Sequence, residues 1–428
     1  MVAGQYWIET LGCPKNEVDS DKLVGTLTAD GMRSAASPEE ADLVVINTCA
    51  FIEAARQESI DTVLTLAEQS PDAQVVVTGC MAERYGDELA EALPEVDAVS
   101  GFGVPVTLGQ KPTSVNVPSF DLLNLPRPAS TRPWAYVKIA EGCDRNCGFC
   151  AIPTFRGPQR SRSHEAILDE VSGLEAKEIV LVAQDLAAFG RDQGVGERSI
   201  VQLVGEVSEL VDRVRLLYLY PSDLTEELIQ AILATGVPYF DLSLQHVSRP
   251  LMRRMRRWGD GERFLERIAH IRSISPDAAF RSNFIVGYPG ETEEDHDALL
   301  DFVEQAQLDW CGFFSYSKED GTYAADLDGE VAPDLVAERL RELTELQDSI
   351  TAARRDDLIG QTVSILVDEQ GIGRTHREAP EIDGVVRISA DLEVGAFYDV
   401  VIAGALGPDL EAEGATFEGT FLDDGEEE

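Results

Sequence analysis

Residues 134–357 repeat one pattern six times, in which a short strand-like run of apolar residues is followed by a helical stretch. Repeated strand–helix units form parallel sheets, because each helix carries the chain back so that the next strand runs in the same direction. Eight such units close a full barrel, and six are too few. We therefore predict an open, partial (β/α)6 barrel. Its strands are expected within residues 135–141, 178–185, 214–221, 239–245, 280–287 and 310–317.

A second parallel α/β sheet is predicted for residues 1–103. Apolar runs at 5–12, 41–52 and 73–81 have the composition of buried strands, and residues 53–69 have the pattern of a helix. Strands that alternate with helices indicate a parallel sheet. The chain as a whole is thus expected to be an α/β multidomain protein.

The two remaining regions differ from these domains in composition. Residues 104–133 contain six prolines and little periodicity, which is typical of an extended linker. Residues 358–428 hold short strand-like runs separated by turns, which predict a small β-barrel, and they end in the acidic tail DDGEEE. The strands of this barrel are expected at residues 361–369, 384–390, 397–405 and 416–422.

Three cysteines follow the first strand of the predicted partial barrel: Cys143, Cys147 and Cys150, in the spacing C-x3-C-x2-C. Ligands of β/α folds bind outside the carboxyl ends of the strands, so a loop there can gather three thiolates. Three thiolates on a four-iron cluster leave one iron open to a small molecule. Two alternatives stay open, namely a zinc site whose fourth ligand lies elsewhere and a redox pair made by the CGFC run.

Cys13, Cys49 and Cys80 form a second candidate group in the first domain. They are too far apart for a local zinc motif, yet each follows a predicted strand. Parallel strands place their carboxyl ends on one edge of the sheet, so we expect these cysteines to share a metal centre. The alternative is that they are buried core residues. Cys311 lies inside a predicted strand without partners and is expected in the core.

The cysteine loop and the six units after it resemble the radical S-adenosylmethionine enzymes. The resemblance implies that the open iron binds the amino and carboxylate groups of S-adenosylmethionine, and that reduction releases a 5′-deoxyadenosyl radical.

The segment NFIVGYPGETEED resembles the family's glycine-containing segment beside the cofactor, although an ordinary turn at a strand end would also explain its glycines. Gln184 and Asp185 end the second barrel strand, where polar groups often face a ligand. The expected cofactor contacts are Phe149, Gln184, Gly287, Pro289 and Gly290.

Two cysteine trios on two α/β domains, followed by a small β domain similar to a TRAM module, resemble the methylthiotransferases over nearly the whole chain. The resemblance implies two 4Fe-4S clusters, of which the one on Cys13, Cys49 and Cys80 carries the sulfur. One S-adenosylmethionine would methylate that sulfur, and a second would supply the radical that removes hydrogen from an unactivated carbon. Such a C–H bond has no usable acidity, so the cofactor carries the chemistry and we name no catalytic base.

The methylthiotransferases have two main branches, which modify either an adenosine of transfer RNA or an aspartate β-carbon on the twelfth protein of the small ribosomal subunit. The net charge of the chain is −43, and residues 360–428 hold 17 acidic residues against three arginines, a net charge of −14. Such a surface repels phosphate and attracts a basic protein, although solubility or adaptation to salt would also explain it. The run TLGCPKNEVDSD resembles the ribosomal-protein branch, whereas the transfer-RNA branch has Gln-Met-Asn after the cysteine. We predict the aspartate methylthiotransferase, with the transfer-RNA adenosine 2-methylthiotransferase as the alternative.

Partners and location are less constrained by the sequence. The arginines of residues 249–257 are open to two interpretations, contact with ribosomal RNA beside a protein substrate or a solvated helix face. A non-catalytic iron–sulfur scaffold that docks on the ribosome is a further alternative, and it would not need the S-adenosylmethionine segment. We also expect a cytoplasmic monomer that receives electrons from a donor and has no membrane contact, because we find neither a signal peptide nor a membrane span.

Overall fold

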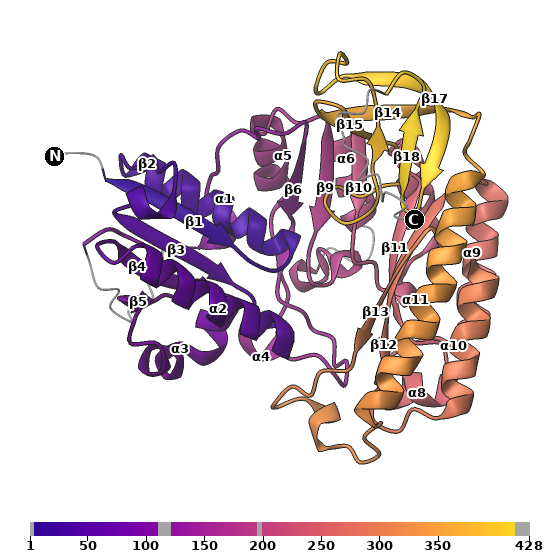
Figure 1. Ribbon diagram of the computed structural model, residues 1–428, viewed down its shortest axis with the longest axis horizontal. Helices are drawn as coiled ribbons and strands as arrows, with labels where there is room; N and C mark the ends of the chain where they lie inside the picture. Colours follow the sequence, from indigo (N-terminus) through magenta and orange to yellow (C-terminus); the bar gives the residue numbers. More distant parts are fainter. Residues whose placement is uncertain (1–3, 110–120, 195–198, 416–428) are drawn as a thin grey trace, which may run out of the picture.

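Three domains follow one another along the chain in the computed structural model, which describes residues 4–109, 121–194 and 199–415 (Figure 1). An N-terminal sheet lies beside a central half-barrel, and a small C-terminal barrel packs on the half-barrel. This confirms the predicted α/β multidomain fold. No helix within the described residues is long and apolar enough to cross a membrane.

The N-terminal domain is a five-stranded sheet of order β2-β1-β3-β4-β5, and all its strand pairs are parallel. Its central strand, LVVINT, is buried along its whole length, as expected where helices cover both faces of a sheet. The three predicted strands and the predicted helix at residues 53–69 are confirmed. The elements are β1 Gln5–Thr10, α1 Pro14–Ala29, β2 Arg33–Ser34, β3 Leu43–Thr48, α2 Glu53–Gln69, β4 Gln74–Gly79, α3 Cys80–Ala92 and β5 Ala98–Val99.

The half-barrel contains the six predicted strands in sequence order. Three pair in the order β10-β9-β6 and three in the order β11-β12-β13, and a parallel bridge between Leu219 and Leu242 joins the two groups. Among the described residues no pairing joins β6 to β13, so the barrel is open, as predicted. The strands are β6 Trp134–Lys138, β9 Glu178–Val182, β10 Arg213–Leu216, β11 Tyr239–Gln245, β12 Ala279–Val286 and β13 Trp310–Ser315.

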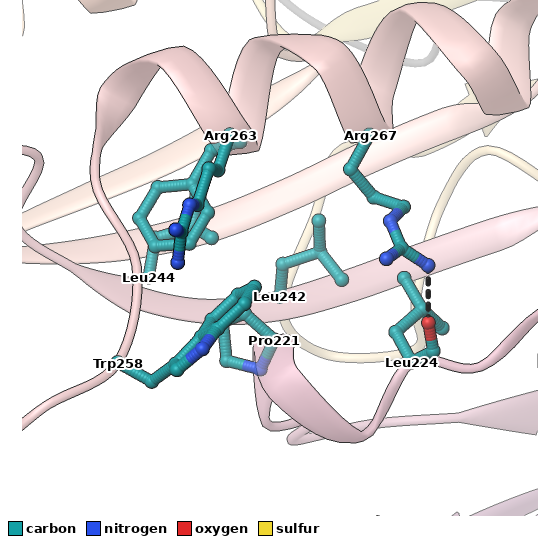
Figure 2. Close-up of a pocket in the computed structure, with 8 residues that line it drawn as sticks. Pro221, Leu224, Leu242, Leu244, Trp258, Arg263 and Arg267 are labelled. Atoms are coloured by element: carbon teal, nitrogen blue, oxygen red, sulfur yellow. Dashed lines mark hydrogen bonds between the residues drawn. The ribbon is translucent and has the colours of Figure 1, made fainter.

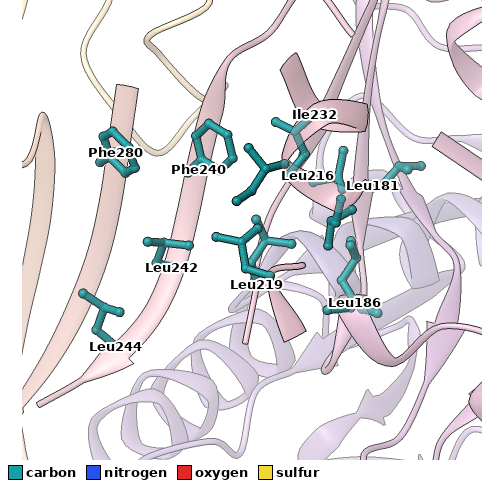
Figure 3. Close-up of a cluster of buried hydrophobic side chains, with 14 of the residues drawn as sticks. Leu181, Leu186, Leu216, Leu219, Ile232, Phe240, Leu242, Leu244 and Phe280 are labelled. Atoms are coloured by element: carbon teal, nitrogen blue, oxygen red, sulfur yellow. The ribbon is translucent and has the colours of Figure 1, made fainter. Parts of the chain in front are cut away.

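Helices cover the outer face of the half-barrel and form its main core. Figure 3 shows this core, with Leu181 and Leu216 on one side and Phe240 and Phe280 on the other. Each of these side chains is fully buried, and such burial contributes roughly 1.5–3 kcal/mol per side chain. The helices of this region are α4 Ile152–Arg156, α5 His164–Gly173, α6 Ser199–Ser208, α7 Glu226–Ala234, α8 Arg249–Arg254, α9 Gly261–Ile274, α10 Glu293–Ala306 and α11 Pro333–Asp356.

The concave face of the half-barrel is filled from both neighbouring domains. Val18 of α1 and Ala379 of the C-terminal domain pack in one cluster with Tyr136 and Val180 of the strands. Glu319, which follows β13, is buried and forms ion pairs with two arginines of the N-terminal domain. These are Arg56 of α2 at 2.5 Å and Arg84 of α3 at 2.7 Å. The first domain is therefore fixed against the barrel by both apolar and ionic contacts.

The C-terminal domain is a closed five-stranded barrel, as predicted, in the order β14-β15-β16-β18-β17. It contacts the amino ends of the half-barrel strands, where Arg374 pairs with Glu178 at 3.2 Å. Residues 416–422, where a strand was predicted, and the acidic tail lie outside the described residues. The strands are β14 Thr362–Glu369, β15 Ile372–Arg374, β16 Val386–Arg387, β17 Phe397–Leu406 and β18 Asp409–Ala412.

The described part of the predicted linker packs against the domains on both sides of it. Leu122 and Leu123, in the 3-10 helix Leu122–Asn124, are buried, and Lys22 of α1 donates a hydrogen bond to the carbonyl oxygen of Leu123. Arg127 donates to the carbonyl oxygen of Tyr136 in β6 at 2.7 Å. The domain boundaries at residues 103, 133 and 357 stay a prediction.

Candidate active site

The loop that carries Cys143, Cys147 and Cys150 is closed at its base by a two-stranded ribbon, β7 Ala140–Glu141 with β8 Arg160–Ser161. Gly142 begins the loop at φ +79°, and a Cβ there would lie 2.2 Å from the carbonyl oxygen of Pro158, so only glycine fits. Within the loop, the amide of Gly148 donates to the carbonyl oxygen of Met255 at 2.8 Å. The backbone around the three cysteines is thus held by the barrel itself.

The second trio comes from three neighbouring strands of the N-terminal sheet. Cys13 caps α1 just after β1, Cys49 follows β3, and Cys80 begins α3 directly after β4. At Gly12, where φ is +96°, a Cβ would lie 3.0 Å from the Sγ atom of Cys49, which shows how closely the first two loops approach. The structure therefore brings the three widely spaced cysteines to one edge of the sheet.

Thiols within each trio oppose the ionisation of one another. Burial raises the pKa of the Cys49 thiol to about 12, and the nearby Cys80 and Cys13 add to this effect. In the loop trio, burial raises the pKa of Cys150 to about 12, with contributions from Cys147 and Cys143. Thiolates gathered in this way require positive charge among them, which the irons of a cluster supply.

The described residues include no group of three or more His, Cys, Asp or Glu side chains arranged to hold a single metal ion. A four-iron cluster is larger than one ion, and its thiolate ligands lie further apart. Within each trio the thiols lie close enough to affect the ionisation of one another, as a shared cluster would require. Cys49 and Cys80 are buried, and the other four cysteines are partly exposed. The role of the six cysteines as cluster ligands stays a prediction.

Each trio also receives a hydrogen bond from one arginine. The Nη2 atom of Arg156 lies 2.9 Å from the Sγ atom of Cys80, and the Nη1 atom of Arg257 lies 3.3 Å from the Sγ atom of Cys147. At Cys13, burial opposes the thiolate, but Lys15 and Arg156 lower the pKa of the thiol below its ordinary value. These cations favour the thiolate form, which is the form that binds iron.

Arg156 links the second trio to the cysteine loop. Besides Cys80, it donates to Oδ1 of Asn16 at 2.9 Å and to both carboxylate oxygens of Glu141 at 3.0 Å. Glu141 stands two residues before Cys143, and the Nε2 atom of Gln184 donates to it at 2.7 Å. A buried polar chain therefore runs from the N-terminal sheet to the second barrel strand.

Sequence reasoning did not identify Arg156, Glu141 or Asn16 as site residues. The only signal in the sequence is that Glu141 and Arg156 flank the cysteine motif on either side. Lys138 and Asp19 complete the set by pairing with each other, and Lys138 also donates to Glu141 at 2.7 Å. All five side chains are buried.

The predicted S-adenosylmethionine contacts differ in their surroundings. Gln184 joins the polar chain through its nitrogen, while its buried Oε1 atom has no partner among the described residues and can accept a hydrogen bond from a ligand. Phe149 is partly buried against the barrel core.

Gly287 and Gly290 both have positive φ and face the protein. A Cβ would meet Val336 at Gly287 and Arg254 at Gly290. The carbonyl oxygen of Pro289 accepts a hydrogen bond from Arg254 at 2.8 Å. The glycine segment thus has a packing reason for its conformation, and its contact with the cofactor stays a prediction.

Most of the arginine-rich segment is engaged within the protein. Arg254 binds the Pro289 carbonyl oxygen, Arg256 stacks on the ring of Tyr323 at 3.6 Å, and Arg257 reaches the cysteine loop. Arg249, Arg253 and Arg256 are all exposed, and because Arg256 is stacked on Tyr323, Arg249 and Arg253 are the ones we expect to meet a partner. Cys311 is partly buried and packs against the main core.

The pocket in Figure 2 lies on the outer side of the barrel, between α9 and the 3-10 helix Pro221–Asp223. Trp258 and Arg263 cover it, Arg267 donates to the carbonyl oxygen of Leu224, and its volume is only about 10 Å³. A shallower groove of about 670 Å³ continues past it. Neither is lined by a cysteine, so neither belongs to the two trios.

Comparison with known proteins covers all three domains. Family profiles match in chain order: uncharacterized protein family UPF0004 at residues 5–101, the radical SAM superfamily at 137–303 and the TRAM domain at 359–414. The Cutibacterium acnes protein named ribosomal protein uS12 methylthiotransferase RimO is 41% identical over 464 aligned positions, which cover 94% of this chain and 96% of that protein. The Moorella thermoacetica protein of the same name is 42% identical, over 89% of this chain and 92% of its own. Among solved structures, the cobalamin-dependent S-adenosylmethionine radical enzyme OxsB aligns with a TM-score of 0.49 and 12% identity, over 81% of this chain and 56% of that chain. The two cysteine trios fall within the first two profile matches.

Proposed function

The chain belongs to the RimO family of ribosomal protein uS12 methylthiotransferases, and on that premise we propose that it attaches a methylthio group to the β-carbon of an aspartate of uS12. One structural observation supports the proposal above the others. Two trios of fully or partly buried thiols stand on facing domains, and Arg156 connects them through hydrogen bonds to Cys80 and Glu141. A radical enzyme that also delivers sulfur needs two such centres.

The radical SAM match and the family membership assign S-adenosylmethionine and iron–sulfur chemistry to the chain. We propose that each trio holds its own 4Fe-4S cluster. When bound, the cluster of the loop trio and S-adenosylmethionine would supply a carbon-centred radical, and the cluster on Cys13, Cys49 and Cys80 would supply the sulfur. Electrons come from a separate electron donor.

The residues of this chain bind, orient and shield these groups. Arg156 and Arg257 donate to thiolates of the two trios, which lowers the negative charge that each buried centre presents. Gln184 is held by Glu141 and leaves its Oε1 atom for the amino group of S-adenosylmethionine. Val18 and Tyr136 fill the concave face of the barrel and limit the entry of water.

Charge supports a protein substrate over transfer RNA. A net charge of −43 repels phosphate backbones and attracts a basic ribosomal protein. Arg249 and Arg253, the exposed arginines of α8, are the residues we propose for contact with ribosomal RNA beside uS12. We propose that the enzyme acts as a cytoplasmic monomer.

The test incubates the reconstituted protein with S-adenosylmethionine and dithionite, in the presence of either isolated uS12 or transfer RNA. Mass spectrometry of uS12 should show the gain of one methylthio group less one hydrogen, located on an aspartate. A gain on transfer RNA alone would assign the enzyme to the adenosine-modifying branch. Absence of 5′-deoxyadenosine from a cluster-loaded protein would instead favour the non-catalytic scaffold.

A further inference from the structure

Lys15 is a buried lysine beside the trio of Cys13, Cys49 and Cys80. It lies in the first turn of α1, two residues after Cys13, and only 9% of its surface is exposed. Its Nζ atom lies 3.5 Å from the centroid of the Tyr218 ring. Tyr218 follows β10 at the carboxyl edge of the half-barrel. The ammonium group therefore stands between the N-terminal sheet and the barrel edge that carries the cysteine loop.

Among the described residues two other lysines are fully buried, and each has a carboxylate partner. Lys22 pairs with Glu170 at 3.4 Å, and Lys138 pairs with Asp19 and with Glu141 at 2.7 Å. For Lys15, no hydrogen-bond acceptor or carboxylate lies within bonding distance among the residues that the structure describes. The Cys13 thiolate offsets part of the cost of burying this cation, and the ring face of Tyr218 offsets another part. Neither accepts a hydrogen bond from the ammonium group, so its donors are left for an anion from outside the described chain.

We propose that Lys15 binds the side-chain carboxylate of the aspartate that is modified, an inference that rests on the proposed function. That carboxylate is attached to the β-carbon that receives the methylthio group, so a cation beside both domains would hold the reacting carbon between the trios. The Cys13 thiolate interacts with Lys15, but it is expected to bind iron, and Cys80 already accepts a hydrogen bond from Arg156. Lys15 is in this role a specificity-determining residue, since an asparagine or an uncharged side chain would leave its ammonium unpaired.

The experiment measures binding of uS12 to the cluster-loaded enzyme, with the substrate aspartate either present or replaced by asparagine. Four proteins are compared: wild type, Lys15→Met, Lys15→Arg and the control Lys177→Met, which removes an exposed lysine that pairs with Asp212 at 3.5 Å. Wild type should bind the aspartate form roughly 10- to 100-fold more tightly than the asparagine form, as expected of a hydrogen bond between charged groups. Lys15→Met should bind both forms equally, at the asparagine level of wild type. Lys15→Arg should keep most of the preference, and Lys177→Met should keep all of it.

Iron content and formation of 5′-deoxyadenosine without substrate are measured in the same samples, and the control Lys177→Met should leave both unchanged. A preference for the aspartate form that falls in Lys15→Met only in proportion to lost cluster iron would show that Lys15 serves the thiolates and would overturn the proposal. The proposal would also be overturned if Lys15→Met bound both uS12 forms more weakly by the same factor, because that result indicates a structural role. A wild-type enzyme that modifies uS12 but binds both forms alike would overturn the role of Lys15 and leave the proposed function intact. A wild-type enzyme that modifies no uS12 would overturn both.

Discussion

The two cysteine trios reach similar surroundings by different routes. The loop trio spans eight residues of one loop, whereas the sheet trio is assembled from the ends of three strands that are far apart in sequence. The loop is held by its ribbon base and by hydrogen bonds to the barrel, such as Gly148 to Met255. The sheet trio exists only when the N-terminal domain is folded, and Arg156 reaches it from outside that domain. We expect the loop trio to tolerate disturbance of its neighbour better than the sheet trio does.

The largest expected effect separates the roles of the two trios. Cys49→Ala removes one ligand of the sheet trio, so uS12 modification should be abolished while reductive cleavage of S-adenosylmethionine continues. Cys147→Ala should abolish both activities, because it removes the centre that binds S-adenosylmethionine. Iron content, 5′-deoxyadenosine and the mass of uS12 are measured in parallel. If Cys49→Ala also stops 5′-deoxyadenosine formation in a folded protein with an intact loop cluster, the division of roles is wrong.

The second largest effect is expected when the guanidinium group of Arg156, which connects the two trios, is removed. Arg156→Met leaves the buried carboxylates of Glu141 and Asp19 without one of their cations, which should lower the free energy of unfolding by about 3–5 kcal/mol. Arg160→Met is the matched control, because Arg160 pairs with Asp121 at the surface with 56% of its side chain exposed, and it should cost about 0–1 kcal/mol. Denaturant unfolding of the cluster-free proteins measures both. Equal losses in the two variants would refute the bridging role of Arg156.

The features that could be predicted from the sequence are those set by local pattern. The six barrel strands are runs of buried apolar residues such as the EIVLV of β9, and the convergence of Cys13, Cys49 and Cys80 follows from the geometry of parallel strands. Short strands with polar or glycine residues, β15 (IGR) and β18 (DLEA), carry no such pattern and were not predicted.

Long-range pairing of buried charges could not be predicted either. Nothing in the residues around Arg156 specifies that it meets Cys80, which lies 76 positions earlier in the chain. The same holds for Lys15 and Tyr218, which belong to different domains. Such contacts depend on how two finished domains dock, and the docking surface is encoded by residues spread over both.

A smaller effect is expected from crowding the sheet trio. In Gly12→Ala the new Cβ would lie 3.0 Å from the Sγ atom of Cys49 in a backbone conformation with φ +96°, and the strain should cost about 1–3 kcal/mol. Gly31→Ala has a similar φ of +87° but nothing within 4 Å of the new Cβ, so it isolates the conformational cost of about 1 kcal/mol. With Cys147→Ala as background, iron bound by the sheet trio should fall in Gly12→Ala and stay normal in Gly31→Ala. Normal iron binding in both would show that the two loops are less closely fitted than the structure indicates.

The smallest expected effect concerns the reduction potentials of the two centres. Arg257→Lys keeps a positive charge but removes the guanidinium donor that lies 3.3 Å from the Sγ atom of Cys147. Hydrogen bonds to cluster sulfurs raise the potential, so the loop cluster should become harder to reduce, by on the order of 59 mV or less, which corresponds to at most a tenfold change in a one-electron equilibrium. Arg156→Lys should shift the potential of the sheet cluster in the same direction and leave the loop cluster unchanged. Redox titration followed by electron paramagnetic resonance distinguishes the two signals. A shift of both potentials in either variant would mean that the polar chain through Glu141 couples the centres electrostatically, and the trios would then act as one unit despite their different origins in the sequence.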